Sequence, residues 1–382
     1  MAIDFQPCWT DTELELYRDM VVRFIEQEMQ PDDGAARHRG HVGHAIWRRA
    51  GEVGLLCSDI PEAWGGGGGD FRHEAVLYEE MARRSLTGMS VSVHSIVAHY
   101  ILNHGTEAQK ARYLPRMARG ELVGAIAMTE PGAGSDLQGI RTRAIRSGDD
   151  YVINGAKTFI TNGLLAGLVL VVARTAPEQG SRGISILIVE TADCRGYRVG
   201  QPLDKIGLKA QDTSELFFDD VRVPADRLLG GEEGRGFAQL MADLPYERLI
   251  IAVMAVAMME GAYHETLAYV RERTAFGKPV AEFQNTRFKL AGIATHVKAA
   301  RTFIDRCVQD MVAGKLDTVT ASMAKAWATD LQGKVIDECL QLFGGYGYTN
   351  DYVIGRMYVD ARVQRIYGGT NEIMMEVIAR AL

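Results

Sequence analysis

The sequence is poor in cysteine, and its cysteines are scattered. Five occur among 382 residues, at Cys8, Cys57, Cys194, Cys307 and Cys339, and no two form a CxxC pair. An odd, unpatterned set argues against a disulfide framework and a cysteine-rich metal site. No HExxH pair of histidines occurs either, so we predict no metal. This cysteine usage favours a reducing, cytoplasmic location.

The sequence also lacks an excess of positive charge and any very long apolar run. Its 42 lysines and arginines are outnumbered by 49 acidic residues, for a formal net charge of -7. Nucleic-acid binders usually carry basic patches, so we expect no nucleic-acid partner. No apolar stretch reaches the ~20 residues that span a bilayer, and the first residues lack the order of a signal peptide. We therefore expect no membrane partner.

What is present is the balance of a globular protein, with 47% hydrophobic and 24% charged residues. Residues 1–121 place apolar side chains at helical spacing, residues 122–232 hold short strand-like runs broken by glycines and Asn-Gly steps, and residues 233–382 are helical again. This order predicts an α+β fold, with an N-terminal helical domain, a central antiparallel β-barrel or sandwich, and a C-terminal helical domain. The C-terminal helices are expected at 237–272, 283–312, 318–342, 352–364 and from 371 onward.

A carboxylate lies where one helix enters the core. Glu247 and Arg248 directly precede the apolar run 249–259. Asp243 is a suitable N-cap and Pro245 suits a first turn, so a helix is predicted to begin here. The run is too long for an ordinary strand and too short to span a membrane, which predicts a helix buried on all sides. Glu247 is then either a catalytic carboxylate or a first-turn residue stabilised by the helix dipole, and spacing alone favours the second interpretation.

Several glycine turns carry polar or aromatic neighbours. The segment 128–136 (MTEPGAGSD) combines a tight turn with hydroxyls and free N–H groups, which suits an anionic or multi-acceptor ligand. The segment 159–163 (FITNG) places an aromatic ring and a threonine on a strand edge, where a flat ring could stack. Three further segments are 269–278 (YVRERTAFGK), 341–348 (QLFGGYGY) and 366–372 (IYGGTNE).

These five segments, in this order and at these separations, resemble the acyl-CoA dehydrogenase family. The resemblance covers about 14–380, and the segments LPYERL and GLKAQDTSELFFDD are most similar to the long-chain branch. It implies a helical domain, a β domain and a four-helix bundle. It also implies a homotetramer that binds FAD between subunits, oxidises an acyl-CoA substrate and passes electrons to electron-transfer flavoprotein.

The resemblance also assigns site residues. For the flavin ring it implies Thr129 at the pyrimidine edge, Phe159 flanking the ring where many relatives have tryptophan, and Thr161 near N5. The other implied cofactor residues are Ile126, Met128, Ser135, Arg273 and Phe276 (both toward a neighbouring subunit), Gln284, Gln341, Gly344, Gly345, Thr370 and Glu372. The implied substrate residues are Ser135, Ser181, Arg248 and Gly369.

One departure from the family pattern concerns the catalytic base. Many members have glutamate at the position of Gly368, so the usual base is absent here. Either the chain is a silent acyl-CoA-binding subunit of a hetero-oligomer, or the base lies elsewhere. Long-chain and isovaleryl-type members place it on the helix that begins at LPYERL, where Glu247 matches. We therefore expect a dehydrogenase with Glu247 as α-proton base, in which Gly368 retains a backbone N–H for the thioester carbonyl.

Two questions stay open at this level. A family relative with an oxidase or DNA-associated role is a third candidate, but no basic patch supports it. Acyl length, branching and the choice between CoA and a carrier-protein thioester are not encoded in motif spacing, because pocket depth depends on side-chain packing.

Overall fold

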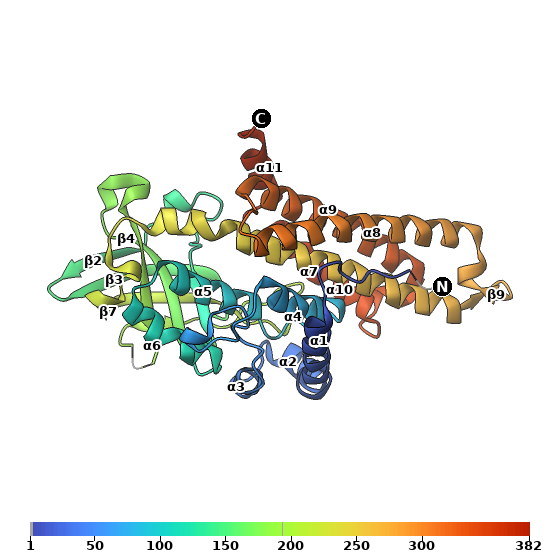
Figure 1. Cartoon of the computed structure of the whole chain (residues 1–382), viewed down its shortest axis with the longest axis horizontal. Helices are drawn as coiled ribbons and strands as arrows, with labels where there is room; N and C mark the ends of the chain where they lie inside the picture. Colours follow the sequence, from blue (N-terminus) through green and yellow to red (C-terminus); the bar gives the residue numbers. More distant parts are fainter. Residues whose placement is uncertain (1–2, 193) are drawn as a thin grey trace.

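The computed structural model describes residues 3–192 and 194–382, and it consists of helices, a sheet and helices in that order (Figure 1). Local signals account for the N-terminal helices. The Asp11 carboxylate accepts a hydrogen bond from the backbone N–H of Leu14, and Thr106 and Gln109 form a capping box. These helices are α1 (Thr12–Phe24), α2 (Gln30–Arg39), α3 (His44–Glu52), α4 (Phe71–Arg83), α5 (Val91–His104) and α6 (Glu107–Ala118).

The central region is a seven-stranded sheet of order β1-β4-β2-β3-β7-β6, with β5 also paired to β4. Most pairings are antiparallel, but β4 runs parallel to β1, with Gly124 opposite Leu168, and to β2, with Arg143 opposite Arg174. The expected purely antiparallel sheet is therefore corrected to a mixed one, because the chain crosses over β2 and β3 before returning beside β1. The strands are β1 (Gly124–Ala127), β2 (Arg143–Ser147), β3 (Asp150–Thr161), β4 (Leu168–Arg174), β5 (Ile184–Glu190), β6 (Tyr197–Val199) and β7 (Thr213–Pro224).

The C-terminal region is a helical bundle. The helix α10 packs against α7 and α9, which completes the expected four-helix bundle, and α11 packs on α9. A small hairpin of β8 (Thr274–Ala275) and β9 (Lys278–Pro279) joins α7 to α8. The helices are α7 (Gly236–Glu272), α8 (Gln284–Val312), α9 (Thr318–Phe343), α10 (Val353–Ala361) and α11 (Asn371–Ala379).

The helix α7 connects the three regions, since it runs from the sheet into the bundle (Figure 1). The expected range 237–272 is confirmed to within one residue, because α7 begins at Gly236 and ends at Glu272, whereas the start inferred from Asp243 is wrong, since the helix runs through Pro245. The proline removes one hydrogen bond, but Gln239 and Leu240 are buried, so packing holds the earlier turns in place. The run 249–259 is buried as predicted, apart from a partly exposed Met254.

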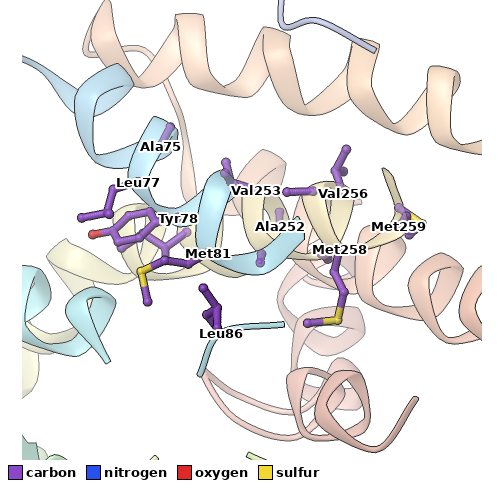
Figure 2. Packing of buried hydrophobic residues seen from close by; sticks show 14 of the residues in the cluster. Ala75, Leu77, Tyr78, Met81, Leu86, Ala252, Val253, Val256, Met258 and Met259 are labelled. Atoms are coloured by element: carbon purple, nitrogen blue, oxygen red, sulfur yellow. The ribbon is translucent and has the colours of Figure 1, made fainter. Parts of the chain in front are cut away.

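The largest apolar core surrounds this helix. Side chains of α4, among them Tyr78 and Met81, belong to the same apolar cluster as Val253, Val256 and Met258 of α7 (Figure 2). The N-terminal helices and the bundle therefore share one core, which fixes the position of α7 relative to α4. No helix within the described residues is both long and apolar enough to cross a membrane.

Candidate active site

A cavity of about 480 Å³ lies where α5, α7, the sheet and the turn before α11 meet. This volume falls in the range of small-molecule sites. Ten of the predicted site residues line it: Ile126, Met128, Thr129, Ser135, Phe159, Thr161, Glu247, Arg248, Gly368 and Gly369.

A second recess, of about 520 Å³, lies at the far end of α7 and α9, and four more predicted residues line it: Arg273, Gln341, Gly344 and Gly345. The other predicted residues line neither space. Phe276 is 97% exposed in the β8–β9 hairpin, and Thr370 caps α11 by accepting a hydrogen bond from the backbone N–H of Ile373. Ser181 lies in the turn 177–183, Gln284 begins α8, and Glu372 lies in the first turn of α11.

Glu247 is a buried carboxylate, 8% exposed, that lines the first cavity. Its Oε1 accepts a hydrogen bond of 2.8 Å from the hydroxyl of Tyr100. Burial raises the pKa of Glu247 to about 7; the Tyr100 hydrogen bond and Arg248 lower it, and the charge of Asp243 raises it. Because α7 begins at Gly236, Glu247 is not in the first turn, and the helix-dipole interpretation is wrong.

The turn that holds Gly368 and Gly369 requires glycine. Both residues have left-handed backbones, with φ of +64° and +83°. A Cβ on Gly368 would lie 2.4 Å from Cδ1 of Ile251, which is far inside van der Waals contact. The side chain of Ile251, on α7, therefore occupies the space that a residue at 368 would need.

Lys325 of α9 anchors this turn from the bundle. Its Nζ donates hydrogen bonds to the carbonyl of Gly369 at 2.7 Å and to Oδ1 of Asn371 at 2.8 Å. Burial, followed by the charge of Arg248, lowers the pKa of Lys325 to about 8. Sequence reasoning missed this residue, although a single lysine in the otherwise uncharged segment 321–328 was a signal for it.

Phe159 lies at the rim of the cavity in an unusual conformation. It has a left-handed backbone, with φ of +59°, and its side chain is 67% exposed. Such strain in a non-glycine residue concentrates at functional sites. Two residues on, Oγ1 of Thr161 accepts a hydrogen bond from Nε2 of Gln211. An exposed ring beside an oriented hydroxyl is a suitable edge for a flat heteroaromatic ligand.

A buried ion pair holds the glycine turn 128–136 in place. The Lys157 ammonium donates to a Glu130 carboxylate oxygen at 2.8 Å and to the carbonyl of Met128 at 2.9 Å. The same carboxylate accepts hydrogen bonds from the backbone N–H groups of Arg141 and Thr142. The turn is therefore tied to β3, and Thr129 and Ser135 are presented to the cavity.

These features fit FAD. The side chains of Ile126 and Met128 offer apolar surface and the ring of Phe159 a flat face, while the hydroxyls of Thr129 and Thr161 offer polar edges. The second recess combines the cationic Arg273 with Gly344 and Gly345, at which an added Cβ would meet nothing within 4 Å. Open glycines beside a guanidinium suit a phosphate-bearing ligand.

Comparisons with known proteins agree with this geometry. The N-terminal, middle and C-terminal domain models of acyl-CoA dehydrogenase match residues 11–121, 125–221 and 234–382. The chain is 50% identical over 374 residues to a mitochondrial long-chain specific acyl-CoA dehydrogenase of Mus musculus, covering 97% of this chain and 86% of that protein.

Solved structures give the same result. An acyl-CoA dehydrogenase of Geobacillus kaustophilus superposes with a TM-score of 0.95 at 45% identity, over 98% of this chain and 99% of the other. A glutaryl-CoA dehydrogenase of Mycobacterium smegmatis in complex with FADH2 superposes with a TM-score of 0.90 at 28% identity, over 97% and 95%. The chain therefore belongs to the acyl-CoA dehydrogenase family and is an FAD-dependent oxidoreductase that acts on acyl-CoA.

Proposed function

We propose that this enzyme converts saturated acyl-CoA thioesters to trans-2-enoyl-CoA and that Glu247 takes the α proton. One observation carries the assignment. Among the described residues that line the cavity, Glu247 is the buried carboxylate, whereas Asp136 and Glu376 are exposed. A base of this kind also argues against the silent-subunit alternative.

The environment of Glu247 suits the task. The α C–H of a thioester is a weak acid, and a fully hydrated carboxylate is too weak a base to remove its proton readily. Burial disfavours the charged form, which strengthens the base. A pKa of about 7 for Glu247 leaves a useful ionised fraction near neutral pH while keeping the carboxylate basic.

Loss of the α proton places negative charge on the thioester carbonyl, and the backbone N–H of Gly368 is the proposed donor to it. The Lys325 anchor and the Ile251 contact hold the turn that carries this N–H. The β C–H electron pair would leave the substrate with the hydride, for which FAD supplies the acceptor at flavin N5, and the α C–H electron pair, left behind by the proton, forms the new double bond.

The cofactor assignments follow the two spaces. We propose that Ile126, Met128, Thr129, Phe159 and Thr161 hold the flavin ring. The recess at Arg273, Gln341, Gly344 and Gly345 would take the phosphate and adenosine half of an FAD bound to a second copy, in a homotetramer. The exposed Phe276, with Gln284, would complete the cofactor site across that boundary, whereas Thr370 and Glu372 would contact the pyrophosphate side of FAD.

The substrate assignments rest on the same cavity. Arg248 lines it with a buried Nε that has no partner among the described residues, which supports a role in binding the CoA portion. Ser135, Ser181 and Gly369 are proposed as further substrate contacts. A third, smaller space of about 80 Å³ shares Val93, Met254 and other lining residues with the first cavity and reaches toward Tyr78. This extension supports long-chain acyl groups as the substrate class.

Three further assignments stay predictions: electron-transfer flavoprotein as electron acceptor, a cytoplasmic location, and domain limits of 1–121, 122–232 and 233–382. The mouse relative is described as mitochondrial.

Anaerobic reduction of bound flavin by a panel of saturated acyl-CoAs tests the proposal. In the parent protein, the bound flavin should be bleached by acyl-CoAs with long straight chains. In Glu247→Gln, this bleaching should be at least about a hundredfold slower, the low end of the effect of a positioned base. Glu265→Gln, an exposed glutamate on the same helix, is the control. Equal rates for Glu247→Gln and the parent protein would show that Glu247 is structural.

A further inference from the structure

Behind Glu247, the helix α5 presents three polar side chains to α7. Tyr100, Asn103 and His104 have the spacing i, i+3 and i+4, so they share one face of α5. On α7, Asp243 and Glu247 are likewise four residues apart. The Tyr100 hydroxyl donates to Oε1 of Glu247 at 2.8 Å.

The second carboxylate is held in the same way. Nδ2 of Asn103 donates to Oδ1 of Asp243 at 2.7 Å, and Nε2 of His104 lies 2.7 Å from Oδ2. Each carboxylate of the α7 pair therefore has its own partner on α5. We call these five residues the α5–α7 clamp.

The clamp reaches Glu247 from the side away from the cavity. Glu247 lines the cavity, but Tyr100, Asn103, His104 and Asp243 do not, and Tyr100 is 0% exposed. Among the described residues, Oε2 of Glu247 has no hydrogen-bond partner, whereas Oε1 is occupied by Tyr100. One oxygen is thus anchored and the other is left for a proton.

The hydrogen bond from Tyr100 and the charge of Asp243 shift the pKa of Glu247 in opposite directions. A phenol that donates to a carboxylate stabilises the ionised form, and a second carboxylate one turn away destabilises it. For Glu247 the hydrogen bond from Tyr100 lowers the pKa, the charge of Asp243 raises it, and the charge of Arg248 on the same helix lowers it. Packing alone does not require two buried carboxylates on one face of a helix, because they repel.

We propose that Tyr100 is a positioning residue for α-proton transfer, which fixes Oε1 of Glu247 so that Oε2 faces the substrate, and that Asp243 sets the base strength of Glu247. Neither residue touches the substrate, so both act through Glu247. The proposal rests on the proposed role of Glu247 as the base.

The test compares Tyr100→Phe and Asp243→Asn in the FAD-bound enzyme. Tyr100→Phe should slow flavin reduction by about tenfold or more, because a misplaced catalytic group is costly. In the pH profile of kcat/KM, the midpoint of the acidic limb reports the pKa of the base in the free enzyme. It should move to higher pH in Tyr100→Phe, which loses a hydrogen bond to the ionised form, and to lower pH in Asp243→Asn, which loses a repelling charge. A general loosening of the fold would not produce opposite shifts.

Tyr113→Phe is the matched control. Tyr113 is also fully buried, but its hydroxyl lies near Glu190, away from the cavity. This variant should therefore keep the parent rate of flavin reduction and the parent acidic limb of the pH profile. Flavin content and the thermal unfolding midpoint establish that each variant is folded. If Tyr100→Phe loses flavin, the limb of Asp243→Asn decides: a shift to lower pH supports the clamp, and an unchanged limb overturns it.

The outcomes separate this proposal from the one it rests on. The clamp is rejected, and Glu247 remains the base, if Glu247→Gln reduces flavin slowly while a folded Tyr100→Phe keeps both the parent rate of flavin reduction and the parent acidic limb. The clamp is also rejected if the acidic limbs of Tyr100→Phe and Asp243→Asn move in the same direction. A fast Glu247→Gln rejects both, since Tyr100 would then have no base to position.

Discussion

Gly368→Ala probes how tightly the glycine turn is packed against α7. Two costs are expected. A left-handed backbone at a non-glycine residue costs about 1 to 2 kcal/mol. The added Cβ, 2.4 Å from Cδ1 of Ile251, adds an overpacking cost of about 1 to 3 kcal/mol. The sum is about 2 to 5 kcal/mol of lost stability.

The second cost can be separated from the first, because Ile251→Val removes the clashing Cδ1. Alone, Ile251→Val should cost about 0.5 to 1.5 kcal/mol. In the Gly368→Ala background it should instead recover most of the overpacking cost, since the next Ile251 atom lies 3.9 Å from the added Cβ, in ordinary contact. The coupling between the two sites is thus expected to be about 1 to 3 kcal/mol.

Gly148→Ala is the matched control for the backbone cost. Gly148 has φ of +67° and no atom within 4 Å of an added Cβ. It should show the left-handed cost without any coupling to Ile251→Val. Denaturant unfolding followed by circular dichroism and flavin fluorescence measures the parent protein, the three single variants and the two double variants with Ile251→Val. Strictly additive effects of Gly368→Ala and Ile251→Val would refute the contact.

Three other outcomes are expected. Burial raises the pKa of Glu247 in the folded state above its value in the unfolded state, so the favourable contribution of the protonated carboxyl to stability is present at low pH and is lost as pH rises toward about 7. Glu247→Gln should therefore raise the thermal midpoint more at pH 8 than at pH 5. An equal change at both pH values would contradict this. Arg301→Met leaves the buried Glu79 and Glu260 without their closest shared cation and should cost about 3 to 5 kcal/mol in denaturant unfolding, whereas the exposed Arg306→Met should cost at most about 1 kcal/mol. Arg273→Ala should weaken FAD retention in dialysis, because a guanidinium–phosphate pair is charge-assisted; unchanged retention would remove Arg273 from the cofactor site.

Local sequence patterns determined much of the layout. Apolar spacing and capping residues such as Asp11 are local signals, because a helix is built from bonds within one segment. The α+β order was therefore predictable, and the family resemblance carried by the glycine motifs and the LPYERL segment identified ten residues that line one cavity. The expected range 237–272 matched α7, but the local signals Asp243 and Pro245 pointed to a later start, which packing of Leu240 and Gln239 overrides.

Contacts between distant segments were decided only by the tertiary structure. The parallel pairing of Gly124 with Leu168 depends on how the chain crosses the sheet. Tyr100 and Glu247 are 147 residues apart, and Lys325 and Gly369 are 44 apart, so no periodicity relates them. The pKa of Glu247 depends on burial, which follows from packing α5 against α7. Sequence thus named the candidate base, whereas packing determined its burial, its hydrogen bond to Tyr100 and the cavity it lines.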